Sequence, residues 1–156
     1  DIKMDKRILM IGIGNSGRGD DALGWKFIDE TEPLGFEVDY RYQLQIEDAA
    51  LIKEYDLVIF VDASAQPLEG GFSFRPCEIK NTITFSSHRI DPCSILWLCQ
   101  ELYGTTPEAY VMAIEGNHWE LQQGMSPEAE KNLAKAIRYF NQWVAEVPAK
   151  AALHAG

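Results

Sequence analysis

The chain has 156 residues, 46% of them hydrophobic and 24% charged, which is typical of one globular domain. Its formal net charge of −10 argues against a nucleic-acid partner or an anionic membrane surface, because both attract basic faces. No apolar run approaches the ~20 residues of a membrane span, and residues 1–7 lack the apolar stretch of a secretion signal. We therefore expect a cytoplasmic protein that makes no membrane contact and can accept a cationic ligand.

Strand-like and helix-like segments alternate along the chain, which predicts one α/β domain with a mostly parallel sheet. The expected strands are 7–13, 36–42, 56–61, 72–76 and 109–114, and the expected helices are 20–31, 49–54, 91–104 and 126–147. A proline in segment 72–76 favours an edge strand there. The domain is expected over residues 7–147, with residues 1–6 disordered or derived from a tag and residues 148–156 a disordered tail.

The cysteines are Cys77, Cys93 and Cys99, an odd number without the spacing of a zinc site. We interpret them as reduced thiols of the core.

The loop after the first strand is the most informative segment. Three of its glycines have the spacing of a dinucleotide-binding fingerprint: Gly12, Gly14 and Gly17. Asp39 follows in the second strand, where such proteins often carry an acidic residue. However, Asp20 and Asp21 stand at the start of the next helix, where a bound phosphate would be repelled unless a metal intervened. The pattern favours a cation site, with Asp20 as helix N-cap, over a nucleotide site.

Two further residues extend this hypothesis. Asp62 ends the most apolar strand, and His88 lies in the loop before the helix that starts near residue 91. Because carboxyl ends of parallel strands meet at one edge of a sheet, we expect Asp62 to face Asp21. Two carboxylates and one imidazole would suit zinc, nickel or cadmium. The alternatives are that Asp62 is a turn carboxylate and that His88 and His118 are solvated loop histidines.

Three motifs together resemble the maturation endopeptidases of nickel–iron hydrogenases. The first is Gly-x-Gly-Asn after a strand, then four residues, an acidic pair, two residues and glycine, as in segment 12–24. The second is an apolar strand that ends in Asp-Ala, as in segment 58–63, and the third is the loop histidine His88. The order and spacing fit over residues 7–146. Many members carry Asp-Gly-Gly-Thr after the second strand, whereas segment 42–47 here is similar to a branch associated with cytosolic NAD(P)-linked hydrogenases.

The resemblance implies a three-layer α/β/α sandwich with a twisted, mostly parallel five-stranded sheet, in which we expect segment 72–76 as the antiparallel edge strand. It also implies that Asp21, Asp62 and His88 bind a metal and carry the catalysis, supported by Asp20. Gly14 and Asn15, from the first motif, are expected to support the same site. The metal would be nickel carried by the substrate, or zinc, and no nucleotide cofactor is expected.

Enzymes of this family remove a short C-terminal peptide from the hydrogenase large subunit after nickel insertion. The implied partner is therefore an immature large subunit, and the implied activity is that of an endopeptidase which activates another enzyme. Two alternatives stay open, a nickel-sensing chaperone that binds the immature subunit without cutting it and a nucleotide-binding enzyme. No serine or cysteine has an evident histidine base, so covalent catalysis is not indicated.

Overall fold

The structure, a computed structural model, describes residues 6–79, 90–121 and 124–155, the last nine as backbone only. The expectation for residues 1–6 concerns a segment that lies, except for Lys6, outside the described residues. So does His88.

Five strands form one sheet. In spatial order they are β2 (Phe36–Arg41), β1 (Ile8–Ile13), β3 (Leu57–Ser64), β5 (Glu108–Glu115) and β4 (Phe72–Pro76). The first four are parallel, and β4 pairs with β5 in the antiparallel sense at one edge. The predicted α/β class, the five strands and the antiparallel edge strand are confirmed.

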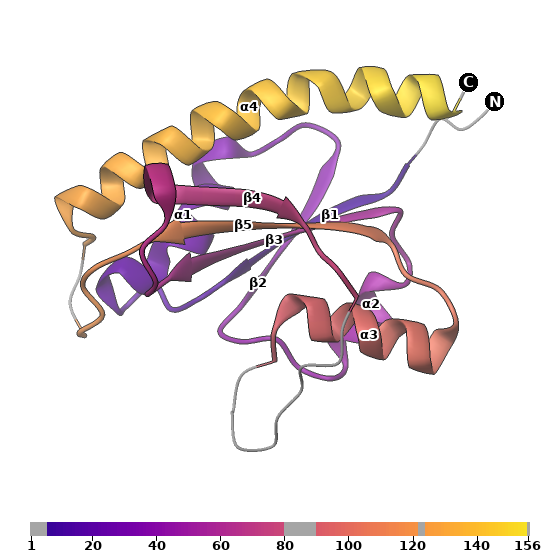
Figure 1. Cartoon of the computed structure of the whole chain (residues 1–156), viewed down its shortest axis with the longest axis horizontal. Coiled ribbons are helices and arrows are strands. Elements are labelled where there is room, and N and C mark those ends of the chain that lie inside the picture. The colour runs from indigo at the N-terminus through magenta and orange to yellow at the C-terminus, as the bar shows by residue number, and fades with distance from the viewer. Residues whose placement is uncertain (1–5, 80–89, 122–123, 156) are drawn as a thin grey trace.

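Helices cover both faces of the sheet (Figure 1). Helices α1 (Leu23–Thr31) and α4 (Pro127–Ala155) lie on one face, and α2 (Asp48–Ile52) and α3 (Pro92–Tyr103) lie on the other. In the central strand β3, Val58 and Phe60 pack toward α2 and α3, whereas Ile59 and Val61 pack toward α1 and α4. Burial on both faces explains why this strand is a continuous apolar run rather than an alternating one.

The ends of α3 follow the predicted chemistry. Asp91 is the N-cap, and its Oδ1 accepts a hydrogen bond from the Cys93 N–H at 2.8 Å. Pro92 occupies the first helical position, where its missing N–H costs nothing. Gly104 ends the helix in the left-handed conformation, with φ of 71°.

Two helix predictions need correction. The chain does not enter α1 directly, because a 3-10 turn over Gly19–Ala22 comes first and contains Asp20. Asp20 is therefore not the N-cap, and its side chain bonds elsewhere, as described below. Helix α4 continues to Ala155, although a disordered tail was expected from Pro148. The tail is rich in alanine, the residue with the highest helix propensity, and this outweighed its small, polar appearance.

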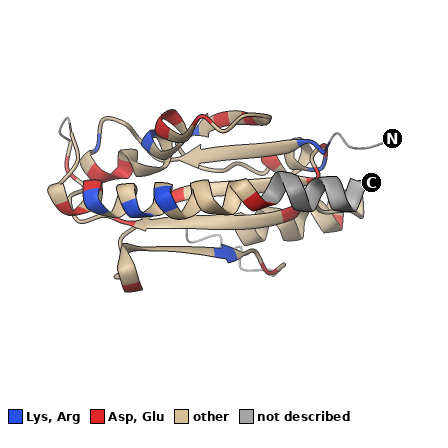
Figure 2. Cartoon of the chain, turned by 90° about the horizontal axis from the view of Figure 1, so that it is seen from above, with Lys and Arg blue, Asp and Glu red and all other residues tan. Residues whose placement is uncertain are grey.

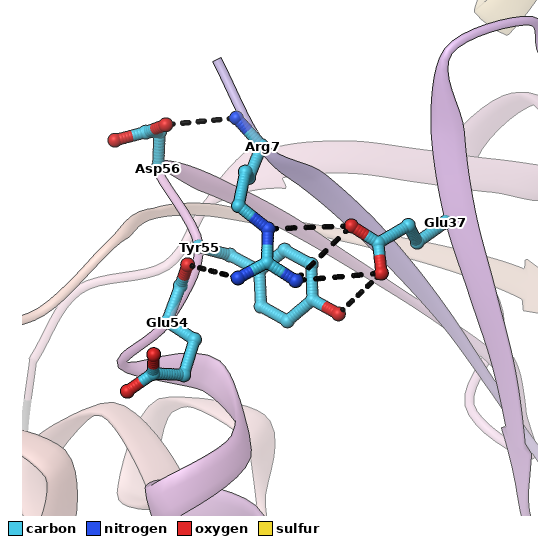
Figure 3. A network of polar contacts seen from close by, with 5 residues as sticks. All are labelled: Arg7, Glu37, Glu54, Tyr55 and Asp56. Atoms are coloured by element: carbon cyan, nitrogen blue, oxygen red, sulfur yellow. Dashed lines mark hydrogen bonds and ion pairs between the residues drawn. The ribbon is translucent and has the colours of Figure 1, made fainter. Parts of the chain in front are cut away.

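The amino ends of the strands are joined by an ion-pair cluster around Arg7 (Figure 3). The Arg7 guanidinium bonds the Glu37 carboxylate at 3.2 Å and the Glu54 carbonyl oxygen at 3.3 Å, and it lies over the Tyr55 ring. The Arg7 N–H donates to Asp56 at 2.8 Å. These contacts fix the start of β1 between β2 and the turn before β3.

Charged residues are spread over the outside of the fold (Figure 2). The exposed residues of α4 include the basic Lys131, Lys135 and Arg138. In the described ranges, no helix combines the length and the apolar character needed to cross a membrane.

Candidate functional site at the carboxyl edge of the sheet

The glycine loop after β1 uses its backbone N–H groups inside the protein. The Gly14 N–H donates to the Arg41 carbonyl oxygen at 2.9 Å, and the Asn15 N–H donates to that of Asp21 at 3.1 Å. The Gly17 N–H donates to the side-chain Oδ1 of Asn15 at 2.8 Å. A pyrophosphate cradle needs such N–H groups directed at the ligand, so this loop is not arranged as one.

Asp39, the residue that would bind a ribose in a dinucleotide-binding site, already has a partner within the protein. Its carboxylate forms an ion pair with the Arg41 guanidinium at 2.9 Å. Both observations weigh against a nucleotide site.

Asp20 is fully buried and holds two distant segments together. Its Oδ2 accepts from the N–H groups of Asn117 at 2.6 Å and His118 at 2.9 Å, and from the Ser126 hydroxyl at 2.7 Å. Its Oδ1 accepts from the Ser126 N–H at 2.7 Å. Burial by itself raises the pKa of Asp20, but these hydrogen bonds outweigh it and hold the pKa below the ordinary value for aspartate.

The position of Asp20 ties the 3-10 turn after β1 to the segment after β5 and to the start of α4. The Ser126 Oγ also accepts from the Ala129 N–H at 3.2 Å, so Ser126 is the cap of α4 and a partner of Asp20 at once. Both carboxylate oxygens of Asp20 are therefore engaged within the protein.

Asp21 is partly exposed and lines a pocket of about 330 Å³ at the carboxyl edge of the sheet. The other lining residues are Arg18, Ala63, Ala65 and Trp119. The pocket thus presents a carboxylate, a guanidinium and an indole close together. Such a combination can bind a polar group and an apolar side chain of one ligand.

Two motif glycines allow Asp21 to reach this position. Gly14 has φ of 146°, and a Cβ there would overlap the carbonyl oxygen of Asp21. A Cβ on Gly24 would lie 2.5 Å from the Val61 carbonyl oxygen and 2.6 Å from that of Ile13. The start of α1 therefore packs directly against the ends of β1 and β3, and only glycine permits that approach.

Asp62 lies at the same edge but in a different orientation. It follows Val61, the last residue of β3 in register with β1, and its Oδ1 accepts from the Ala63 N–H at 2.8 Å. Side chains alternate along a strand, so Asp62 lies on the face of Phe60, toward α3, and Ala63 lies on the face of α1. The structure thus places Asp21, in the turn after β1, and Asp62, near the end of β3, at the same edge of the sheet, while Ala63, not Asp62, lines the Asp21 pocket.

The third predicted ligand, His88, falls outside the described residues. Among the residues that are described, no three His, Cys, Asp or Glu side chains gather as a metal site. The two aspartates supply the hard oxygen donors that divalent cations accept, so the donor chemistry fits a metal ion in part. The complete set of three ligands stays a prediction.

Some features of this edge were not found from the sequence. The side chain of His118 is exposed, and its contribution is made through its backbone N–H and carbonyl groups, which bond Asp20. Arg18 and Trp119 line the pocket, whereas the sequence predicts only that the loop 16–19 flexes over a substrate tail and leaves Trp119 open between substrate contact and core packing. Ser126 was predicted as a helix start, whereas its bond to Asp20 joins positions 106 residues apart.

The same fold occurs in hydrogenase maturation endopeptidases of known structure. The HybD endopeptidase of E. coli superimposes with a TM-score of 0.69 and 20% identity, over 90% of this chain and 93% of that one. A hydrogenase 2 maturation peptidase from a Thaumarchaeota archaeon gives 0.65 and 20%, over 90% and 99% of the two chains. The HycI maturation protease of Thermococcus kodakarensis gives 0.64 and 20%, over 92% and 95%.

These superpositions cover nearly the whole of both chains in each pair. The likeness therefore extends over the complete domain and is not limited to a small core motif. Comparison by sequence with protein-family models and with curated proteins gives no match. At this level of identity the likeness establishes the fold, and the activity is a separate question.

Proposed function

We propose that the protein is a metal-associated endopeptidase that removes the C-terminal extension of a nickel–iron hydrogenase large subunit after nickel insertion. One observation carries the proposal. Asp21 lies in the 3-10 turn that follows β1, and Asp62 lies near the end of the adjacent parallel strand β3, in a fold shared with hydrogenase maturation endopeptidases over about nine tenths of the chain. The partner would be the immature large subunit, and the reaction would take place in the cytoplasm.

The carboxylates of Asp21 and Asp62, with His88, would bind the nickel that the substrate presents, or a resident zinc ion. A divalent ion at this position would polarise the scissile carbonyl and make water more acidic. Asp21, which lines the pocket, would orient a water or take its proton. Arg18 and Trp119 line the same pocket and would contact the substrate chain beside the cleaved bond.

Asp20 acts through its neighbour. Its four hydrogen bonds fix the 3-10 turn against the segment after β5, so that the Asp21 carboxylate does not have to be ordered when the substrate binds. A rigid supporting residue of this kind reduces the entropy lost in reaching the reactive geometry.

The test is a processing assay on a purified, nickel-loaded large-subunit precursor, followed by intact mass. We expect the wild type to remove the extension and Asp21→Asn, Asp62→Asn and His88→Ala to slow removal about 100-fold or more. Glu30→Gln is the matched control, because Glu30 is an exposed carboxylate on α1, away from the pocket. Unchanged rates in all three site variants would refute the assignment.

Two alternatives give different results in the same samples. A nickel-sensing chaperone would bind the precursor and leave its mass unchanged. A nucleotide-binding enzyme would be stabilised against heat by NAD, whereas the proposed site is expected to be stabilised by nickel or zinc in the wild type and not in Asp21→Asn.

A further inference from the structure

Two cysteines far apart in the sequence have their sulfur atoms in contact. The Sγ atoms of Cys77 and Cys93 are 2.9 Å apart and 16 positions apart in the chain. Cys77 follows directly after β4, and Cys93 is the second residue of α3. The expectation of three separate core thiols therefore misses a pair that only the fold creates.

Both members of this pair are held by the framework rather than by the segment between them. The Cys77 N–H donates to the Ala109 carbonyl oxygen at 2.8 Å, which prolongs the pairing of β4 with β5. The Cys93 N–H donates to Asp91 at the N-cap of α3. Because a strand end and a helix start fix the two backbones, the sulfur atoms are brought together before any bond forms.

Cys99 has a different environment. It is fully buried, and its Sγ contacts the Thr105 carbonyl oxygen at 3.1 Å. Burial raises the pKa of the Cys99 thiol, so little reactive thiolate is available there. Cys77 and Cys93 are only partly buried, which allows a small reagent to reach them.

We propose that Cys77 and Cys93 are a redox modification site and form a reversible disulfide with a low-molecular-weight disulfide, such as oxidised glutathione, as the oxidant. The thiolate of one cysteine attacks the small disulfide and releases one small thiol, leaving a mixed disulfide. The second cysteine then attacks the protein sulfur of that mixed disulfide and releases the second small thiol. Two protein thiols are oxidised, one small disulfide is reduced to two thiols, and one S–S bond is formed.

In a reducing compartment the pair stays as thiols, and the bond forms when the pool of small disulfides rises. The proposal does not depend on the peptidase assignment, because it rests on the geometry of β4 and α3 alone.

The test starts from the folded wild-type protein, treated with oxidised glutathione and then alkylated under denaturing conditions without reductant. Digestion with trypsin and chymotrypsin cuts after Lys80 and Trp97, so each cysteine falls in its own peptide. We expect one cross-linked pair of peptides that contain Cys77 and Cys93, with Cys99 recovered as the alkylated thiol. Dithiothreitol should abolish the cross-link.

The controls use single substitutions. Cys99→Ser should keep the cross-link, whereas Cys77→Ser and Cys93→Ser should each remove it and accumulate a glutathione adduct on the remaining partner. Recovery of both wild-type cysteines as separate glutathione adducts, a cross-link through Cys99, or a disulfide between two chains would each overturn the proposal. The peptides recovered from the wild-type protein test the proposal on their own, even if a variant folds poorly.

Discussion

The two edges of the sheet handle charge in opposite ways. At the amino edge, Arg7 is surrounded by the groups that neutralise it, namely Glu37, the Glu54 carbonyl and the Tyr55 ring (Figure 3). At the carboxyl edge, Asp20 and Asp21 are adjacent in sequence, but Asp20 is buried with both carboxylate oxygens hydrogen-bonded, whereas Asp21 is partly exposed and lines a pocket. The charge at the amino edge stabilises the fold, whereas at the carboxyl edge one carboxylate stabilises the fold and the next one lines a pocket.

This difference agrees with the general behaviour of parallel sheets, in which ligands bind beyond the carboxyl ends of the strands. It also shows that a polar cluster on this sheet is not by itself evidence of function. Burial in the fold or exposure in a pocket distinguishes a structural charge from a candidate functional one, and substitutions test this one residue at a time.

The largest effect is expected for Asp21→Asn. Processing of the precursor should fall about 100-fold or more, while the free energy of unfolding in urea should change by no more than about 0.5 kcal/mol. The reason is that Asp21 lines a pocket and is not part of the core. If Asp21→Asn instead lost much stability and kept normal processing, Asp21 would have a structural role like that of Asp20, and the proposed difference between the two residues would be wrong.

A smaller but still large effect is expected for Asp20→Ala. The substitution leaves the N–H groups of Asn117, His118 and Ser126 without their acceptor, which should lower the free energy of unfolding by about 3 kcal/mol. Asp20→Asn retains one acceptor oxygen and should lose less. Urea unfolding followed by circular dichroism measures both, and equal stabilities for the wild type and Asp20→Ala would contradict the buried clamp.

The pH dependence of the free energy of unfolding gives a finer test of the buried Asp20 carboxylate. The pKa of Asp20 is lower in the folded protein than in the unfolded chain, so its contribution is complete above the unfolded value, about 3.9. As the pH falls through the folded pKa, that contribution is lost. Between about pH 5 and pH 2, urea midpoints should therefore drop more steeply for the wild type than for Asp20→Asn. Parallel curves would mean that Asp20 carries no such shift.

The smallest effect is expected at the amino edge. Arg7→Met removes the half-exposed ion pair with Glu37 and should lower the urea midpoint only slightly, with an even smaller effect at high salt. Processing of the precursor should be unchanged. A loss of processing in Arg7→Met without unfolding would show that the two edges are coupled.

The sequence predicts the fold well because its signals are local. The apolar run of β3, the Asp91–Pro92 start of α3 and the proline in β4 each report on their own segment, and each proved correct. The length of α4 was wrong because the alanine content of the tail was given too little weight.

The site was predicted only in part. The pattern of glycines and aspartates located the edge of the sheet, since Gly14 and Gly24 mark close approaches of the backbone. The pattern gave Asp20 the wrong structural role, because its partners lie about one hundred residues away and N-capping is the commonest role for an aspartate at a helix start. The contact of Cys77 with Cys93 was missed for the same reason, since it arises from the meeting of β4 and α3.

The long reach of Asp20 has a consequence for the order of events during synthesis. Its acceptor oxygens bond residues 97, 98 and 106 positions later, so the turn that holds Asp21 does not have all of its hydrogen bonds until the start of α4 has been translated. Contacts of such separation form late, because the intervening chain must first be closed into a loop. A nascent chain that has already paired β1, β2 and β3 therefore still lacks the hydrogen bonds of Asp20, which form only when the segment after β5 and the start of α4 are in place.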